Sequence, residues 1–190
     1  MTRYASALSP EYALLGFLAQ KPAHGYELHQ RLSSELGQVW HVSQSQVYNI
    51  LKRLDGQGYI QGEIEEQEKL PARQMYTLTG SGRQRLKDWL ITPTGSSVRA
   101  IRVEFVTRLY FARLLGSDMP SRLLDAQLEE SRSGLARLED LLAETPLEQV
   151  YNRLGLDLRV RQLRAILEWL QESAASLVMD RSYHEDRSSR

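Results

Sequence analysis

The spacing of apolar residues changes twice along this chain, and this change constrains the fold more than any other feature of the sequence. Within residues 43–56 the apolar residues recur every three or four positions, as on one helix face: Val47, Ile50, Leu51 and Leu54. Within residues 59–65 and 73–78 they alternate with polar residues, as in β-strands. From Thr79 to about Ile91 the helical spacing returns. A two-stranded hairpin between two helices is therefore predicted.

Capping residues mark the helices that surround this hairpin. Ser9 is expected to cap a first helix, which ends before Pro22 because a residue preceding proline resists helical backbone angles. A second helix is predicted over residues 25–36. The third has a capping box, in which Ser43 and Gln46 satisfy each other's backbone amides. Three helices, a hairpin and a fourth helix are the elements of a winged helix-turn-helix, whose third helix reads DNA and whose hairpin is the wing.

The second half of the chain has only helical patterns, so the predicted fold class is mainly α, with a two-stranded β wing. Residues 93–97 are small and polar, as in a linker. We expect a winged-helix DNA-binding domain over 1–92, a linker over 93–97 and a helical dimerisation domain over 98–179. A disordered tail is expected over 180–190.

The last helical region carries a heptad repeat, and Thr145 to Glu148 form a capping box expected to begin it. Leucines recur every seven residues, with smaller residues and one leucine between them at the complementary spacing: Leu156, Val160, Leu163, Leu167, Leu170, Ala174 and Leu177. This pattern is typical of a two-stranded coiled coil, although Gly155 weakens its start. We predict that these residues form the interface of a homodimer.

The polar face of the third helix carries the candidate DNA contacts. At about 100° per residue, the face opposite the apolar stripe is centred on Ser45, Asn49 and Lys52. Hydroxyl, amide and cationic side chains contact base edges and phosphates. The predicted DNA-binding residues of helix 43–56, in the major groove, are Ser43, Ser45, Gln46, Tyr48, Asn49, Lys52 and Arg53. A solvated surface is the alternative, and Tyr48 fits a packed aromatic as well as a phosphate contact.

The wing, over residues 59–79, is expected to contact the DNA backbone or the minor groove. Lys69 and Arg73 lie near its tip and add two cations to the predicted DNA surface. The formal net charge of the whole chain is +0, so DNA would be met with one face only.

Composition argues against other functions. The chain has no cysteine, so thiolate metal sites and disulfides are excluded, and none of its four histidines pair at the helical spacing of a metal site. A glycine-rich phosphate loop and a nucleophile elbow are absent, so we expect neither an enzyme nor a cofactor. No apolar run approaches the roughly 20 residues that cross a membrane. With no secretory signal at the N-terminus, a prokaryotic cytoplasmic protein is expected.

Residues 13–90 resemble the PadR family of winged-helix regulators. The motifs that carry the resemblance occur in order as Ala13–Leu18, Pro22–Leu28, Val47–Leu54, Gly58–Ile60, Pro71–Thr79 and Gly82. The helical remainder is similar to the C-terminal domain of the PadR subgroup related to virulence activators, in Arg102–Phe105 and Leu109–Phe111. The resemblance implies a homodimer that binds an inverted repeat of double-stranded DNA, usually as a repressor, which a small molecule releases in some members.

Two further expectations follow from the resemblance. Family members often have glycines at the hairpin tip, where this chain has Glu68–Lys69–Leu70, so its wing would sit differently on DNA. In some relatives a ligand lies between aromatic residues near the dimer axis; Trp169 is the candidate contact here for a small aromatic or hydrophobic effector, with simple packing as the alternative. The alternative function is a winged-helix module that binds protein and not DNA.

Overall fold

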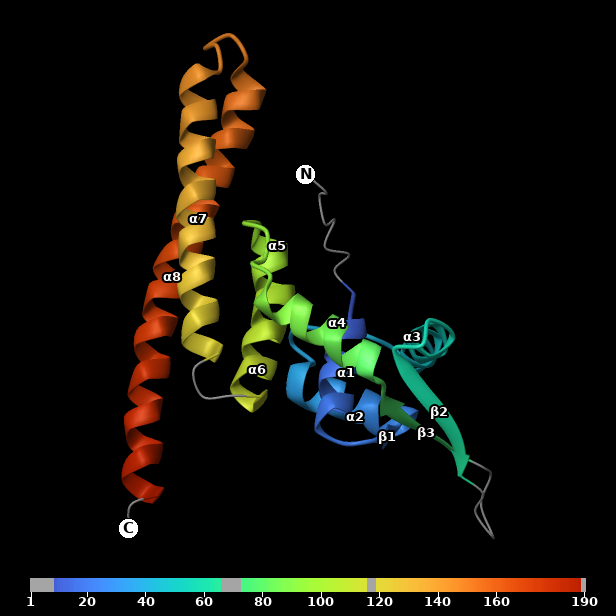
Figure 1. Cartoon of the computed structure of the whole chain (residues 1–190). Helices are drawn as coiled ribbons and strands as arrows, with labels where there is room; N and C mark the ends of the chain where they lie inside the picture. Colours follow the sequence, from blue (N-terminus) through green and yellow to red (C-terminus); the bar gives the residue numbers. More distant parts are fainter. Residues whose placement is uncertain (1–8, 66–72, 116–118, 189–190) are drawn as a thin grey trace. The chain divides into compact units, whose positions relative to one another are not determined.

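The computed structural model describes residues 9–65, 73–115 and 119–188 (Figure 1). Their contacts divide the chain into two compact units. The N-terminal unit comprises the chain up to Thr92 together with Val106–Phe111, and the C-terminal unit comprises Pro93–Phe105 and the chain from Ala112 onward. The N-terminal unit therefore includes one short piece of helix from the second half of the sequence, which a division by sequence position alone does not anticipate.

The N-terminal unit is a winged helix, as predicted, and the chain is mainly helical. Its three strands form one antiparallel sheet in the order β1-β3-β2. The elements, in chain order, are α1 (Glu11–Gln20), β1 (Ala23–His24), α2 (Gly25–Leu36), α3 (Gln44–Gly56), β2 (Ile60–Glu65), β3 (Arg73–Leu78) and α4 (Gly80–Ile91). Fully buried side chains from α1, α2 and α3, among them Leu14, Phe17, Leu28 and Leu51, form the core beneath the sheet.

The predicted capping box forms at the start of α3. The Ser43 hydroxyl accepts the Gln46 amide at 3.3 Å, and the Ser43 amide donates to Gln46 Oε1 at 2.8 Å. Thr79 caps α4 by accepting the Gly82 amide at 3.1 Å. The expected cap of the first helix was displaced by one residue, because Pro10 stands at the N-cap while the Ser9 hydroxyl accepts only the Glu11 amide, at 3.4 Å.

The sequence did not predict β1. This strand has two residues, which is too short to display an alternating pattern, and its pairing with β3 joins Ala23 to Tyr76 and His24 to Met75. The predicted hairpin is formed by β2 and β3, which pair from Ile60 opposite Leu78 to Glu65 opposite Arg73. β3 is thereby the central strand of the sheet, and the wing is anchored to the start of α2 through β1.

A tight turn links α3 to the wing. Gly58 has a φ of 74°, the left-handed conformation that glycine adopts without strain. The Gly58 amide donates to the Asp55 carbonyl at 2.9 Å and the Tyr59 amide to the Leu54 carbonyl at 3.0 Å, which is the Schellman pattern of a helix end. Asp55 also accepts the Gly62 amide of β2 at 3.1 Å. These bonds fix the direction in which the wing leaves α3.

The C-terminal unit is built on two long helices that pack side by side (Figure 1). Its elements, apart from the part of α6 that belongs to the other unit, are α5 (Val98–Ala100), the π-helix η1 (Ile101–Phe105), α6 (Val106–Leu115), α7 (Met119–Glu144) and α8 (Val150–Ser188). In the described ranges, none of the helices combines the length and the apolar character needed to cross a membrane.

The ends of the long helices differ from the sequence prediction in two places. Thr145 ends α7 instead of beginning α8, because its hydroxyl donates to the Leu141 carbonyl at 2.6 Å, and α8 begins only at Val150. The tail from residue 180, expected to be disordered, continues α8 as helix to Ser188. No glycine or proline follows Gly155, so the sequence contains no strong helix breaker there.

Residues 93–97, predicted as a linker, are held against α7. The Thr94 amide donates to Gln127 Oε1 at 3.0 Å, and Gln127 Nε2 donates back to the Thr94 carbonyl at 2.9 Å. Both residues are buried, so these two bonds form where water does not compete with them. The segment is therefore an ordered part of the C-terminal unit.

Candidate nucleic-acid interface and self-association face

Helix α3 has one buried face and one exposed face, as the residue spacing predicts. Val47, Leu51 and Leu54 are completely buried. Ser45, Asn49 and Lys52, at the centre of the predicted DNA surface, are all exposed. This face offers a hydroxyl, an amide and an ammonium group on one rigid helix, beside the wing. Such groups can hydrogen-bond base edges and phosphates.

Ser43 and Gln46 are exposed but occupied by the helix cap. In addition to the amide bonds, the Ser43 hydroxyl donates to Gln46 Oε1 at 3.1 Å and lies 3.0 Å from the Ser45 hydroxyl. Any contact of these side chains with DNA would therefore compete with the bonds that begin α3, and their contribution to such a surface is first of all to hold the helix start.

Tyr48 has a packing role. Its side chain is 41% exposed, and a Cβ added to Gly25 would lie 2.6 Å from its Cε1 atom. The ring thus packs on the first residue of α2, where only glycine leaves room for it. A phosphate contact was the other role considered for Tyr48, and it stays a prediction for the exposed part of the ring.

Arg53 is engaged in an ion pair that the sequence did not indicate. Its Nη2 atom donates to Glu11 Oε2 at 2.7 Å, while half of its side chain stays exposed. The second oxygen of Glu11 accepts Arg85 Nη2 at 2.7 Å. One carboxylate at the start of α1 therefore binds both α3 and α4. These partners lie 42 and 74 positions from Glu11 along the chain, so no local spacing could reveal them.

Arg85 also connects this carboxylate to the root of the wing. Its Nη1 atom donates to the Tyr59 hydroxyl at 3.2 Å, and its guanidinium lies over the Tyr59 ring, 4.5 Å from the centroid. Burial alone would lower the pKa of Arg85, but the hydrogen bond to Glu11 and its negative charge outweigh that effect and raise the pKa above its ordinary value. Arg85 is therefore permanently charged.

The outer part of the wing lies partly beyond the described residues. Lys69 falls outside them, and of Arg73 only the backbone is described, opposite Glu65 at the start of β3. In the described strands, Gln61, Glu63 and Thr77 are exposed, and Gln61 Nε2 donates to Glu63 Oε1 at 3.2 Å. These exposed strand residues supply polar groups but no cation.

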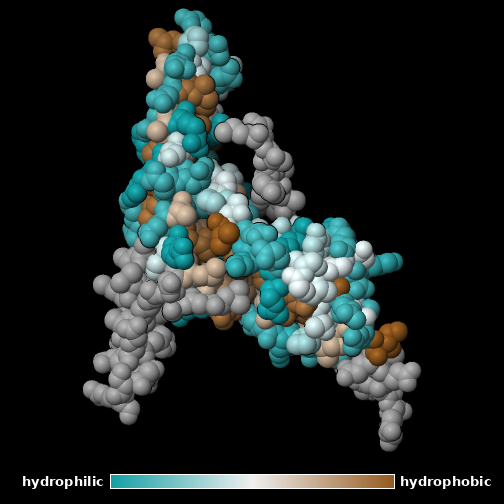
Figure 2. Space-filling view, viewed as in Figure 1, coloured by the Kyte–Doolittle hydropathy of each residue, from teal (hydrophilic) through white to brown (hydrophobic). Residues whose placement is uncertain are grey.

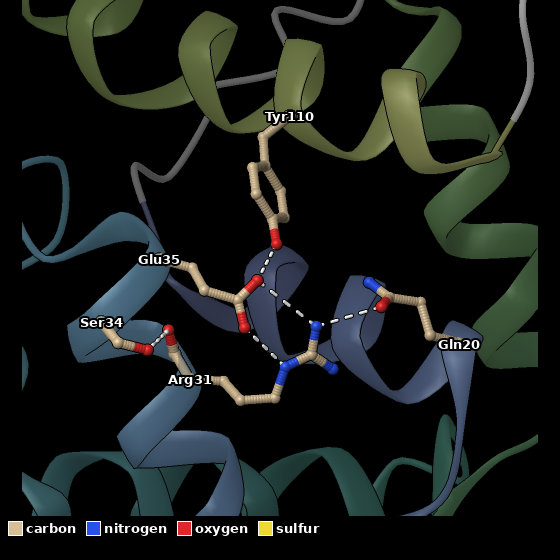
Figure 3. A network of polar contacts seen from close by, with 5 residues as sticks. All are labelled: Gln20, Arg31, Ser34, Glu35 and Tyr110. Atoms are coloured by element: carbon tan, nitrogen blue, oxygen red, sulfur yellow. Dashed lines mark hydrogen bonds and ion pairs between the residues drawn. The ribbon is translucent and has the colours of Figure 1, made fainter. Parts of the chain in front are cut away.

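The beginning of α6 is packed onto the winged helix (Figure 3). The Tyr110 hydroxyl donates to Glu35 of α2, whose carboxylate also accepts Arg31 Nε at 2.8 Å. The Trp40 indole donates to the Thr107 hydroxyl at 2.8 Å. Phe111 fills the space beside Gly16, where a Cβ would lie 2.5 Å from its ring. A piece of the second half of the chain is therefore part of the N-terminal unit, together with α3 and the wing.

The heptad seam of α8 is turned inward, which contradicts its assignment as a dimer interface. Val160, Leu163 and Leu170 are 3%, 2% and 0% exposed in the single chain, and Leu156 and Leu167 are partly covered. α7, whose Leu124 and Leu128 are buried as well, packs along α8. The periodicity was real, but the partner helix comes from the same chain. The side chains of Ala174 and Leu177 lie outside the described set.

A second apolar stripe runs along the opposite side of α8. It contains exposed residues at successive spacings of three, four, seven and four positions: Tyr151, Leu154, Leu158, Ala165 and Trp169. Leu147 and Val150, just before it, are also exposed. Figure 2 shows brown apolar patches where α7 and α8 join. The stripe begins beside an open groove of about 480 Å³, lined in part by Leu141, Tyr151 and Arg159. We call the five residues from Tyr151 to Trp169 the outer stripe.

Trp169 lies at the far end of the outer stripe. Its side chain is 39% exposed, and its ring meets Phe105 edge-on, with centroids 6.3 Å apart. Packing against Phe105 therefore accounts for part of the covered surface of the indole, and another part of the ring is accessible.

Comparison with known proteins relates both halves of the chain to characterised families. The model of the transcriptional regulator PadR-like family matches residues 14–88, and that of the virulence activator alpha C-terminal domain matches residues 101–177. The negative transcriptional regulator PadR of Bacillus subtilis is 36% identical over 131 residues, which cover 68% of this chain and 70% of that protein.

Two solved structures of Bacillus subtilis PadR are also similar. The complex with operator DNA has 30% sequence identity, covers 87% of this chain and 96% of that chain, and gives a TM-score of 0.43. The complex with p-coumaric acid has 28% identity, covers 93% of this chain and 98% of that chain, and gives a TM-score of 0.39.

Proposed function

Because this chain belongs to the PadR-like family of transcriptional regulators, we propose that it binds operator DNA as a homodimer and represses the gene that it controls. The observation that carries the proposal is the exposed polar face of α3, beside a wing whose direction is set by the Schellman turn at Gly58. Family membership also makes the chain a regulator and not an enzyme.

The chemistry of α3 suits the major groove. An asparagine can pair with the N6 and N7 atoms of adenine, and a lysine with O6 and N7 of guanine or with a phosphate. Asn49 and Lys52 are exposed on the same helix face and would take these roles, with Ser45 as a further hydroxyl contact. The wing would lie on the flanking backbone, where Lys69 and Arg73 would neutralise phosphates.

We infer the direction of regulation, repression, from the sequence similarity to Bacillus subtilis PadR. Bacillus subtilis PadR is a negative regulator and has been crystallised with operator DNA and with p-coumaric acid. We therefore assign repression to this chain, with relief by a small aromatic or hydrophobic effector. Trp169 is the proposed aromatic contact, since part of its ring is accessible. The regulator would act in the cytoplasm of a prokaryotic cell, on nucleoid DNA.

The proposed dimer uses the outer stripe instead of the heptad seam. With 3.6 residues per turn, the two sets lie on nearly opposite sides of α8. A helix that is apolar on both sides is stable when both are covered, and α7 covers only one of them. A second copy of the chain is the expected partner, because an inverted repeat presents two equal half-sites and a twofold dimer matches that symmetry.

Selection from random-sequence DNA tests this function without knowledge of the target gene. The full chain is mixed with a pool of random duplexes, and bound duplexes are amplified and sequenced. We expect enrichment of an inverted repeat that also occurs upstream of the gene itself or of a neighbour. Failure to enrich any sequence, with the protein folded and dimeric, would favour the protein-binding module instead.

A further inference from the structure

Glu11 holds two arginines that differ in their surroundings. Its side chain is 10% exposed, and each oxygen accepts one guanidinium nitrogen at 2.7 Å. Arg85 is the more covered of the two, with 32% of its side chain exposed; it also donates to the Tyr59 hydroxyl and lies over the rings of Tyr12 and Tyr59, 5.4 and 4.5 Å from their centroids. Arg53 instead keeps half of its side chain exposed.

A guanidinium presents five N–H donors in one plane, and Glu11 uses only one nitrogen of Arg53. The other nitrogens remain available at the surface, on the last turn of α3, where Arg53 flanks the face centred on Ser45, Asn49 and Lys52. Holding one edge of a guanidinium with a carboxylate fixes the direction of the opposite edge. An arginine that is already held in this way loses less side-chain entropy when it binds a second anion than a freely moving arginine does.

We propose that Glu11 is a positioning residue for DNA binding: it orients Arg53 of α3 so that the exposed edge of its guanidinium meets a DNA phosphate. Glu11 itself touches no DNA. Arg85 completes the arrangement by fixing the carboxylate from α4 and joining it to Tyr59 at the root of the wing. The inference rests on the proposed function, because it assigns an additional role within the same DNA-binding surface.

The positioning role and a simple charge effect predict opposite changes in DNA affinity when Glu11 is replaced. Replacing Glu11 by glutamine removes a negative charge from the DNA-binding unit, so a long-range charge effect alone would tighten binding to DNA. If Glu11 acts by orienting Arg53, the same substitution weakens binding, because Arg53 must then be immobilised by the DNA itself. A loss of folding stability alone would change neither the affinity of the folded dimer nor its dependence on salt.

The experiment measures the affinity of the full-length dimer for the inverted-repeat duplex returned by selection, at several salt concentrations. We expect E11Q to weaken binding about tenfold at unchanged folding, as for the loss of one charge-assisted contact. R53A should weaken it as much and lower the slope of log affinity against log salt by about one counterion. The double variant E11Q/R53A should bind no more weakly than R53A, because Glu11 acts through Arg53.

D88N is the matched control, because Asp88 is an exposed carboxylate of α4, outside α3 and the wing, and its side chain accepts a hydrogen bond from Gln84 and not from an arginine in the described structure. It should bind DNA as well as the unaltered chain or slightly more tightly. R53K is the second variant to measure if E11Q folds poorly. Lysine keeps the charge but lacks the planar fork of arginine, so R53K should lose most of the DNA affinity that R53A loses.

The outcomes separate this inference from the proposed function. If the unaltered chain binds no duplex, the proposed function fails. If the unaltered chain binds while E11Q or R53K binds equally or more tightly, the function stands and the positioning role is overturned. An additional loss in E11Q/R53A beyond R53A would also overturn it, because Glu11 would then act independently of Arg53.

Discussion

Helices α3 and α8 each turn one face inward and leave the opposite face uncovered, but the uncovered faces differ in chemistry. In α3 the exposed residues Ser45, Asn49 and Lys52 are polar or charged. In α8 the exposed residues of the outer stripe are largely apolar, with Tyr151 and Leu158 88% and 56% exposed. A polar face suits an anionic partner such as DNA, whereas an exposed apolar face marks a protein contact.

The comparison shows that periodicity identifies the faces of a helix but not the partner of each face. The apolar stripe of α3 was correctly expected to be buried. The heptad of α8 was equally regular, yet the partner that buries Leu163 and Leu170 is α7 of the same chain. What distinguishes an internal seam from an interface is whether another helix of the chain is long enough and near enough to cover it.

The strongest expected effect separates the two sides of α8. Leu163→Ala should lower the free energy of unfolding by about 2–5 kcal/mol, because it leaves a cavity against α7. Urea denaturation monitored by circular dichroism measures this loss. The matched change is Leu158→Ala on the outer stripe, studied at a concentration where the chain is monomeric; it should cost about 0.5 kcal/mol or less. Similar losses for both variants would contradict the assignment of inner and outer faces.

Charges placed on the outer stripe should break the dimer without unfolding the chain. Leu154→Asp combined with Leu158→Asp would bury unpaired carboxylates in the contact between copies. Sedimentation equilibrium should show a monomer. Affinity for the inverted repeat should fall about 100-fold, because the two half-sites no longer gain from linked binding. A dimer of unchanged stability carrying both charges would move the interface elsewhere.

A smaller effect is expected when one residue of the uncovered face of α3 is replaced. Lys52→Ala should weaken DNA binding by about 1–3 kcal/mol and leave the melting temperature unaltered, since its side chain is exposed. Lys21→Ala, at an exposed lysine outside α3 and the wing, is the control and should bind nearly normally. Fluorescence anisotropy with the selected duplex measures both. Equal losses for the two lysines would mean that this face carries no particular contact.

The smallest expected effect concerns the start of α8. Gly155 lies in the helix, and a Cβ added there would meet nothing within 4 Å. Gly155→Ala should therefore raise stability by about 0.5–1 kcal/mol through helix propensity. At Gly134 of α7 an added Cβ would lie 3.0 Å from the Ser96 hydroxyl, so Gly134→Ala should give no gain. Thermal denaturation compares the two; a loss at Gly155 would indicate that a partner chain packs closely there.

The parts of the fold that the sequence predicted are those encoded by neighbouring residues. The capping box of Ser43, the two hairpin strands and the α2 boundaries depend on spacings of a few positions. β1 was missed because two residues carry no period. The Glu11 carboxylate was missed for a different reason: its partners are brought to it only when α1, α3 and α4 pack together.

In the candidate site, too, the sequence predicted the features that depend on local spacing and missed the contacts between distant residues. Spacing around α3 located the exposed face, but it could not show that Arg53 is held by Glu11 or that Tyr48 packs on Gly25. Nor could it show that Thr107 and Tyr110 belong to the DNA-binding unit, because their contacts with Trp40 and Glu35 cross from one half of the sequence to the other.

A salt titration of DNA binding shows most directly whether the uncovered face of α3 binds DNA. The affinity of the full-length chain for the selected duplex is measured across a range of salt concentrations, for the unaltered chain and for Lys52→Ala. We expect a steep linear fall of log affinity with log salt, as counterions are released, and a slope lower by about one for Lys52→Ala. Binding that is absent, or independent of salt, or whose slope is the same in both proteins, would contradict it.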